Sequence, residues 1–265
     1  MKHEILQPVR HFNMHDDPLT NIETIQLVLW EKGLCIAGFD AEGNVLTTKV
    51  YNANNWNIGT AESIFINEPL VAGHQHITHI WIAEERNLIV PAILFEPDAA
   101  SLWLKQLHLV EEGETILHSK IERTLGAVVS FPVANRLIDM LYKYFGEGRI
   151  SALSSALLCQ EAATTGDALD ITILDQTALF SIYQNGKLLN HQVIDDFDSN
   201  NLVYTIASIS TDNGMEQEQL KVNLSGLCIT ESLALELKSF FPKISVPGSE
   251  QFSSFTFLSK LISCA

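Results

Sequence analysis

Three histidines, His74, His76 and His79, lie within six residues of one another and are potential metal ligands. Residues two apart share a face of a strand, so His74 and His76 could bind one metal ion together. No cysteine and no nearby acidic residue joins them in the sequence. We therefore interpret this segment as a solvated loop without a metal.

Other reactive residue types fit structural roles. Residues 111–114 (Glu-Glu-Gly-Glu) predict an exposed acidic turn. Asp195, Asp196 and Asp198 precede an expected helix, whose N-terminus favours acidic side chains. Cys159 follows two leucines, which indicates a core position. The sequence contains no GxSxG, HExxH, P-loop or GxGxxG motif, so no catalytic residue is predicted.

The composition excludes several classes of protein. The 265 residues are 46% hydrophobic and 18% charged, with 16 basic against 32 acidic residues and a net charge of −16. Both parts of the chain are acidic, so nothing favours binding to nucleic acid or to an anionic lipid surface. No stretch is long and apolar enough for a membrane span, and no leader peptide is expected. Four scattered cysteines without CxxC spacing predict a reducing, cytoplasmic location.

The apolar pattern up to residue 151 predicts a meander of strands followed by helices and further strands. Asp40–Gly43 has the composition of a hairpin turn, Asp98 that of an N-cap, Pro132 that of a first helical turn and Gly146 that of a C-cap. The expected strands are 24–29, 34–39, 45–51, 77–83, 87–90, 115–120, 125–131 and 150–151, and the expected helices are 61–72, 98–107 and 134–145.

The same order returns after residue 168. A helix is expected over 155–163, then strands over 169–174, 178–183, 188–194 and 219–224, helices over 199–209 and 232–241, and a docked apolar segment over 252–262. Asn185-Gly186 predicts a hairpin turn, and Ser225-Gly226 predicts another turn.

An internal duplication is the main prediction from this order. With an offset of 143–144 residues, Leu27 aligns with Ile171 and Glu31 with Asp175. The other aligned pairs are Ile36 with Phe180, Phe39 with Tyr183, Gly43 with Gly186 and Leu46 with Leu189. The predicted organisation is a polar N-terminal arm over 1–20, a first half over 21–148 and a second half over 149–265.

The duplicated order resembles the actin-like ATPase fold, in which two ribonuclease-H-like halves face one nucleotide cleft. The run from Trp81 to Val90, followed by Pro-Ala-Ile-Leu-Phe over residues 91–95, is also similar to a bacterial family of unknown function with that fold. The resemblance implies an α/β protein in which each half is a mixed five-stranded sheet with flanking helices.

The resemblance also implies where a nucleotide would bind. In that superfamily, glycines in the first hairpin of each half admit phosphate and an acidic residue holds hydrated Mg²⁺. The corresponding residues are Glu31 and Gly33 in the first half, Asp175 and Thr177 in the second, and Gly226 at the adenosine-side turn. Leu34 follows Gly33, Lys32 intrudes, and the second loop has no glycine, so all three loops depart from the pattern. The acids also suit ordinary exposed bends, which is the interpretation that we prefer.

Two functions follow as competing hypotheses. We favour a non-catalytic, cytoplasmic scaffold or protein-interaction module, a pseudo-ATPase that binds another protein and has no resident cofactor. The alternative is an atypical Mg-ATP-binding ATPase or sugar-kinase-like enzyme that uses the cleft between the halves, with Glu31, Gly33, Asp175, Thr177 and Gly226 as its nucleotide-binding residues. A cleft of this kind could also hold another small molecule.

Overall fold

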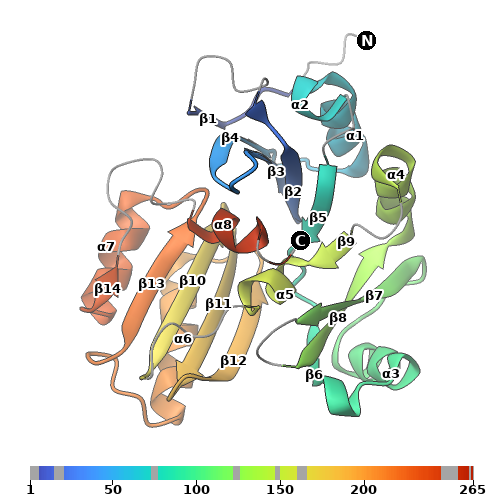
Figure 1. Ribbon diagram of the computed structural model, residues 1–265. Coiled ribbons are helices and arrows are strands. Elements are labelled where there is room, and N and C mark those ends of the chain that lie inside the picture. The colour runs from blue at the N-terminus through green and yellow to red at the C-terminus, as the bar shows by residue number, and fades with distance from the viewer. Residues whose placement is uncertain are drawn as a thin grey trace. The chain divides into compact units, whose positions relative to one another are not determined.

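The structure is a computed structural model that describes residues 6–14, 21–72, 77–121, 126–146, 150–159, 166–245, 256–262 and 264. The chain divides into two compact units, Met1–Cys159 with Leu261–Ala265, and Gln160–Lys260. Each unit has a mixed sheet with helices (Figure 1). The predicted α/β class with two mixed sheets is therefore confirmed.

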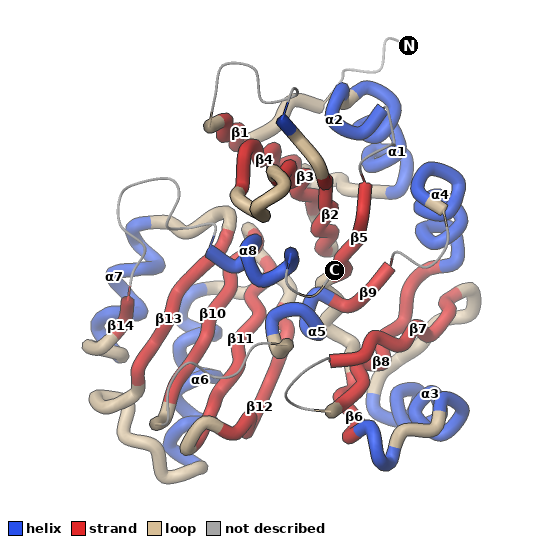
Figure 2. The backbone as a smooth tube through the Cα atoms, in the orientation of Figure 1, coloured by secondary structure: helices blue, strands red, loops and turns tan. Residues whose placement is uncertain are grey.

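The main sheet of the first unit has six described strands in the order β1-β4-β3-β2-β5-β9 (Figure 2). The pairs β1–β4, β4–β3 and β3–β2 are antiparallel, whereas the pairs β2–β5 and β5–β9 are parallel. The strands are β1 (Arg10–Asn13), β2 (Thr24–Trp30), β3 (Gly33–Phe39), β4 (Val45–Asn52), β5 (Ile77–Ile82) and β9 (Ile150–Ala152).

The prediction of five strands in this half was wrong because it placed β1 in a polar arm. The sequence Arg-His-Phe-Asn carries no alternating apolar signal. Its strand conformation comes from hydrogen bonding to the free edge of β4, which local sequence does not reveal. The central strands were predicted correctly because β3 is buried throughout and β2 is buried after Thr24. Strands covered on both faces read as continuous apolar runs.

Besides the helices of the insertion described below, the first unit contains α1 (Ile58–Asn67), α2 (Pro69–Ala72), α4 (Asn135–Phe145) and α5 (Leu153–Leu157). The single helix predicted over 61–72 is interrupted at Glu68, which has φ −82° and ψ 116°. Pro69 explains the interruption, because a proline disfavours helical backbone at the residue before it. Gly146 ends α4 with φ 75°, as its predicted C-cap role requires. Residues 160–163 of the helix predicted over 155–163 lie outside the described residues.

A small antiparallel sheet is inserted between β5 and β9, in the order β6-β8-β7. It comprises β6 (Leu88–Pro91), β7 (Glu114–Ile121) and β8 (Ala127–Ala134), with the helices η2 (Ala92–Leu94) and α3 (Pro97–Leu107). Pro132 was wrongly predicted to begin a helix. It lies in β8 opposite Ile116, beyond the residues that pair with β6, where a missing N–H leaves no gap in that pairing. Asp98 lies in the first turn of α3, and the N-cap is Glu96.

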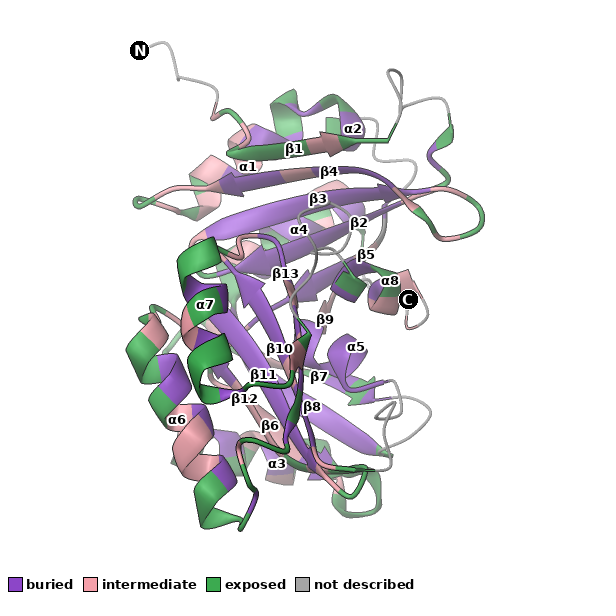
Figure 3. Ribbon diagram, turned by 90° about the vertical axis from the view of Figure 1, so that its left-hand side faces the viewer, coloured by how far each residue is buried: buried purple, intermediate pink, exposed green. Residues whose placement is uncertain are grey.

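The sheet of the second unit has five described strands in the order β12-β11-β10-β13-β14. They are β10 (Ala168–Leu174), β11 (Thr177–Gln184), β12 (Lys187–Ile194), β13 (Lys221–Gly226) and β14 (Ile244–Ser245). The helices are α6 (Ser199–Asp212) and α7 (Glu231–Phe240), and α8 (Thr256–Ile262) follows at the C-terminal end. Side chains from β10 and β11 pack with α6 and α7 in one core, whose strands are buried in Figure 3.

The two sheets share both strand order and register. Removing β1 from the first leaves β4-β3-β2-β5-β9, which corresponds strand for strand to β12-β11-β10-β13-β14. Leu27 faces Ile36 in one hairpin, and their aligned residues Ile171 and Phe180 face each other in the second. The neighbouring parallel strands match too, since Leu27 lies beside Ile80 and Ile171 beside Leu224. Ser225-Gly226, predicted as a turn, forms the end of β13 instead.

Candidate functional site

The two predicted phosphate loops are short bends at equivalent places in the two sheets. Glu31 and Lys32 connect β2 to β3, and Trp30 pairs with Gly33 across the bend. In the second unit, Asp175 and Gln176 connect β10 to β11 in the same way. Glu31 is exposed, and Asp175 is half-buried with φ 59°. Both acids thus lie at tight hairpin bends, as the sequence suggested.

The space beside Gly33 is filled by the protein itself. A Cβ atom at this glycine would lie 2.3 Å from Trp30 Cζ2 and 2.6 Å from the backbone oxygen of Tyr51. Trp30 is 4% exposed, so its indole is part of the core. A phosphate-binding glycine leaves room for an oxygen to approach its backbone. Gly33 instead leaves room for an indole, so it serves packing.

The second bend uses its polar side chain internally. Thr177 is buried, and its hydroxyl donates a short hydrogen bond to Asp195 Oδ1, which follows the end of β12. This bond joins two strands of the sheet. It occupies the hydroxyl that a nucleotide-binding loop would turn toward Mg²⁺ or phosphate.

Gly226 also has a packing role. It is paired with Ile173 in the parallel register of β10 and β13. Ile173 itself precedes Asp175 by two residues. Its φ is 147°, and an added Cβ would lie 2.2 Å from the backbone oxygen of Ile173. The glycine therefore permits a close approach of two backbones near the carboxyl end of β10.

The structure describes one of the three histidines considered as metal ligands. His74 and His76 lie outside the described residues. The His79 ring pairs through Nε2 with Ser151 Oγ at 2.8 Å and stacks on Trp81 with ring centroids 4.0 Å apart. Burial lowers the pKa of His79 to about 4, which keeps the ring neutral. Among the described residues, no three His, Cys, Asp or Glu side chains converge as a metal site.

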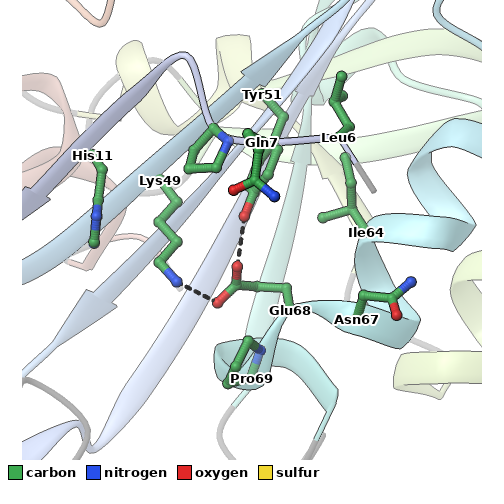
Figure 4. A pocket seen from close by; sticks show the side chains of 10 residues that line it. Leu6, Gln7, His11, Lys49, Tyr51, Ile64, Asn67, Glu68 and Pro69 are labelled. Carbon is green, nitrogen blue, oxygen red and sulfur yellow. Dashed lines mark hydrogen bonds and ion pairs between the residues drawn. The ribbon is translucent and has the colours of Figure 1, made fainter. Parts of the chain in front are cut away.

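A pocket of about 290 Å³ lies between β4, the α1–α2 junction and residues 6–8 (Figure 4). Its most buried charged group is Glu68, which is 7% exposed. Lys49 Nζ donates to Glu68 Oε1 at 2.6 Å, and the Tyr51 hydroxyl donates to Oε2 at 2.5 Å. The backbone N–H of Leu70 adds a third hydrogen bond to Oε1 at 3.3 Å. Lys49 and Tyr51 are two residues apart on β4 and share a face.

This network is suited to holding elements together. Burial and the neighbouring carboxylate raise the pKa of Tyr51, so its proton stays on the hydroxyl. The carboxylate receives three donors and is neutralised by Lys49, so it is not free to act as a base. The hydrogen bonds of Lys49 and Tyr51 to Glu68 therefore anchor the α1–α2 junction to β4. This group was not among the residues predicted from the sequence, although the alternation of Lys49 and Tyr51 on a strand was a usable signal.

Six of the large apolar side chains that are exposed among the described residues belong to the insertion between β5 and β9. We define the η2–α3 surface as Ile93, Leu94, Leu102, Trp103, Leu107 and Leu109. Ile93 is 93% exposed, Leu109 77% and Leu107 65%. Both η2 and α3 pack on β8. Exposed apolar side chains concentrated in one insertion make it a candidate interaction site.

Comparison with solved structures agrees with this architecture. A Bacteroides thetaiotaomicron protein with an actin-like ATPase fold and unknown function is similar with a TM-score of 0.78 and 17% identity, covering 96% of this chain and 100% of that one. The cytoplasmic domain of EpsL, an inner membrane component of the Vibrio cholerae type II secretion system, is similar with a TM-score of 0.52 and 12% identity, over 91% and 95% of the two chains. A chain of the PilM–PilN type IV pilus biogenesis complex gives 0.59 and 11%, over 91% and 97%.

The chain thus has the actin-like ATPase fold. Residues 27–244 match the family described as "Protein of unknown function (DUF3822)", and the protein belongs to that family. No curated protein matches the sequence. Across the described residues, no helix is long and apolar enough to cross a membrane.

Proposed function

We propose that this protein is a non-catalytic, cytoplasmic scaffold that works by binding another protein. The η2–α3 surface is the observation that carries the proposal, because a helix that buries only Ala100 and Leu104 leaves Leu102, Trp103 and Leu107 in solvent. Tryptophan is enriched among the residues that supply most of the binding energy of protein interfaces, and exposed leucines beside it add apolar area to bury. Relatives in fold occur in secretion and pilus assemblies, which agrees with such a role by analogy.

The charge around the surface favours a particular kind of partner. Between residues 91 and 112 the acidic residues are Glu96, Asp98, Glu111 and Glu112, against one basic residue, Lys105. All five are exposed. A partner segment with an apolar face and flanking lysine or arginine residues would match both the apolar centre and the acidic rim. The acidic rim and the net charge of −16 disfavour an anionic membrane and a second copy of the chain.

The contacts made by the residues expected to bind nucleotide support the non-catalytic part of the proposal. Trp30 fills the space at Gly33, Thr177 is bonded to Asp195, and Gly226 is packed against Ile173. The competing possibility, Mg-ATP binding, has in its favour the two acids Glu31 and Asp175 at equivalent bends. Calorimetric titration with ATP and ADP, with and without Mg²⁺, separates the two. We expect no heat up to millimolar nucleotide, whereas micromolar binding that Asp175→Ala abolishes would refute the non-catalytic role.

The protein-binding role is tested with a surface variant. Leu102→Ser combined with Trp103→Ser removes two exposed side chains, so the fold is expected to survive. Leu235→Ser, at a leucine 62% exposed on α7, is the matched control. A partner captured from the source cells is purified and titrated against all three proteins. We expect the double variant to bind about 100-fold more weakly and the control to bind normally. Equal affinity of all three would place the interface elsewhere.

A further inference from the structure

A second pocket in the first unit contains polar groups that have no partner. It has a volume of about 460 Å³ and is lined by Glu23, Thr24, Gln26, Asp40, Ala41, Gly43 and Ile262. Among the described residues, four buried side-chain polar atoms lack a hydrogen-bond partner: Thr24 Oγ1, Gln26 Nε2, Trp30 Nε1 and Asn190 Oδ1. Two of the four atoms, Thr24 Oγ1 and Gln26 Nε2, belong to residues that line this pocket.

The orientation of Gln26 is fixed by its neighbour. The indole N–H of Trp81 can only donate, and it donates to Gln26 Oε1 at 2.7 Å. The amide oxygen must therefore face Trp81, and the NH₂ group must point the other way. Gln26 is fully buried, so this NH₂ group cannot be satisfied by bulk solvent. Thr24 lies two residues earlier on the same face of β2 and presents its unpartnered hydroxyl beside it.

Buried donors without acceptors are costly, which indicates a ligand that supplies an acceptor. An unsatisfied polar group costs about 1–3 kcal/mol in a folded protein. One water would satisfy part of this requirement, but a water occupies only about 30 Å³. The pocket is many times larger, and Ala41 and Ile262 give it an apolar wall. An oxygen acceptor carried on a larger molecule would satisfy the Gln26 NH₂ group and the Thr24 hydroxyl and would fill more of the pocket.

The carboxylates of the lining define the rest of the ligand. Asp40 receives the Asn44 backbone N–H at 2.7 Å and the Asn44 side-chain N–H at 2.9 Å. Its carboxylate is thus held in one orientation, with lone pairs remaining for a cation. Glu23 adds a second negative charge, and no lysine or arginine lines the pocket among the described residues. A cationic group on the ligand is favoured there.

We propose that this pocket binds a small amine of the amino-acid type, with its carbonyl oxygen on Gln26 Nε2 and Thr24 Oγ1 and its ammonium group on Asp40. A modest apolar side chain of the ligand would lie against Ala41 and Ile262. The site is independent of the proposed protein-binding role, because none of its residues belongs to the η2–α3 surface.

L-Leucinamide is the probe, observed through the indole N–H of Trp81 and the side-chain NH₂ of Gln26 in ¹⁵N NMR spectra of the full chain. N-Acetyl-L-leucinamide lacks the ammonium group, and isoamylamine lacks the carbonyl. We expect saturable millimolar shifts with leucinamide and about tenfold weaker binding of each comparison compound. Equal shifts with all three, or no shift of either resonance, would overturn the proposal.

Thr24→Val tests whether the hydroxyl is unpartnered. Because valine has the same shape, the free protein should keep or raise its melting temperature while leucinamide binding weakens about tenfold. Thr47→Val is the matched control, since the buried Thr47 hydroxyl donates to the Phe12 carbonyl and contacts Asn13 Oδ1. This control should melt lower. A lower melting temperature for Thr24→Val with unchanged leucinamide binding would show that a water or protein group already satisfies the hydroxyl.

Discussion

The hairpins β2–β3 and β10–β11 share one register but place glycine at different positions. Gly33 follows the first bend, where the second hairpin has Thr177. On the neighbouring parallel strand the glycine is instead in the second unit. There Gly226 of β13 lies beside Ile173, whereas the equivalent residue of the first unit is Ile82 of β5, which lies beside Leu29. The buried apolar residues fix the pairing in both units. The bends are then completed by whatever local chemistry fits, an indole over Gly33 in one unit and a hydroxyl–carboxylate bond in the other.

This difference shows how one strand register can be kept while its bends are completed by different protein groups. Each glycine is required by a protein group that occupies the space beside it, Trp30 at Gly33 and the Ile173 backbone at Gly226. A glycine in the place expected for a phosphate loop is therefore weak evidence for a phosphate. Substitution at the two positions tests this view directly.

Gly226→Ala should have the largest effect. The new Cβ would lie 2.2 Å from the Ile173 oxygen, at a φ of 147° that alanine rarely adopts. We expect a loss of more than about 4 kcal/mol in the free energy of unfolding, or failure to fold. Chemical denaturation gives the value. The corresponding Ile82→Val, an ordinary core change, should cost only about 1 kcal/mol. A Gly226→Ala protein of normal stability would mean that this glycine is free for another role.

Gly33→Ala should come next, with a loss of about 2–4 kcal/mol. Its methyl group would meet the Trp30 indole and the Tyr51 backbone oxygen, and the indole can move where the backbone cannot. Trp30 fluorescence should change as the ring is displaced. Adding Trp30→Leu to Gly33→Ala should restore part of the stability. If Gly33→Ala were neutral, the tryptophan would not be what the glycine accommodates.

Acid should weaken both units through one half-buried histidine in each. Burial lowers the pKa of His79 to about 4, and that of His191, which pairs with Ser181 at 2.9 Å, to about 4 as well. Unfolded histidine binds its proton near pH 6.5, so stability present at pH 7 is lost as the pH falls from about 6.5 toward 4. We expect about 2 kcal/mol per histidine, measured by unfolding at a series of pH values. NMR titration of either ring near pH 6.5 in the folded protein would contradict this.

Thr177→Val should have the smallest effect, about 1 kcal/mol, because it removes one hydrogen bond and keeps the shape. The bond to Asp195 joins the end of β12 to the bend, so faster amide exchange at that end of β11 is the local measurement. An unchanged exchange rate would indicate that Asp195 contributes nothing to the bend.

The sequence predicted two kinds of element correctly: turns set by their own residue types, and strands whose consecutive residues are buried. The aligned apolar residues located both hairpins, and Asn185 and Gly186 located a turn in which both residues have positive φ. The errors share a cause, since they depend on neighbours distant in sequence. β1 requires the edge of β4, and Pro132 is tolerated because β6 ends before it.

The site was harder to predict than the fold for the same reason. The residue types at the bends suggested phosphate-binding loops. The three-dimensional structure is needed to see that the Trp30 indole packs on Gly33 and that the Thr177 hydroxyl bonds to Asp195. The polar pocket depends on the direction of one amide, which Trp81 determines from another strand. No local motif encodes such an arrangement.

The inserted sheet between β5 and β9 affects how the protein reaches its fold. Sixty-seven residues separate these two paired strands, whereas 17 separate the equivalent β13 and β14. For flexible connections, that difference raises the entropic cost of closing the pair by about 1 kcal/mol. We therefore expect the last strand of the first sheet to join its neighbour late, after the insertion has formed its own hairpin. In refolding followed by amide exchange, β14 should gain its pairing with β13 before β9 pairs with β5.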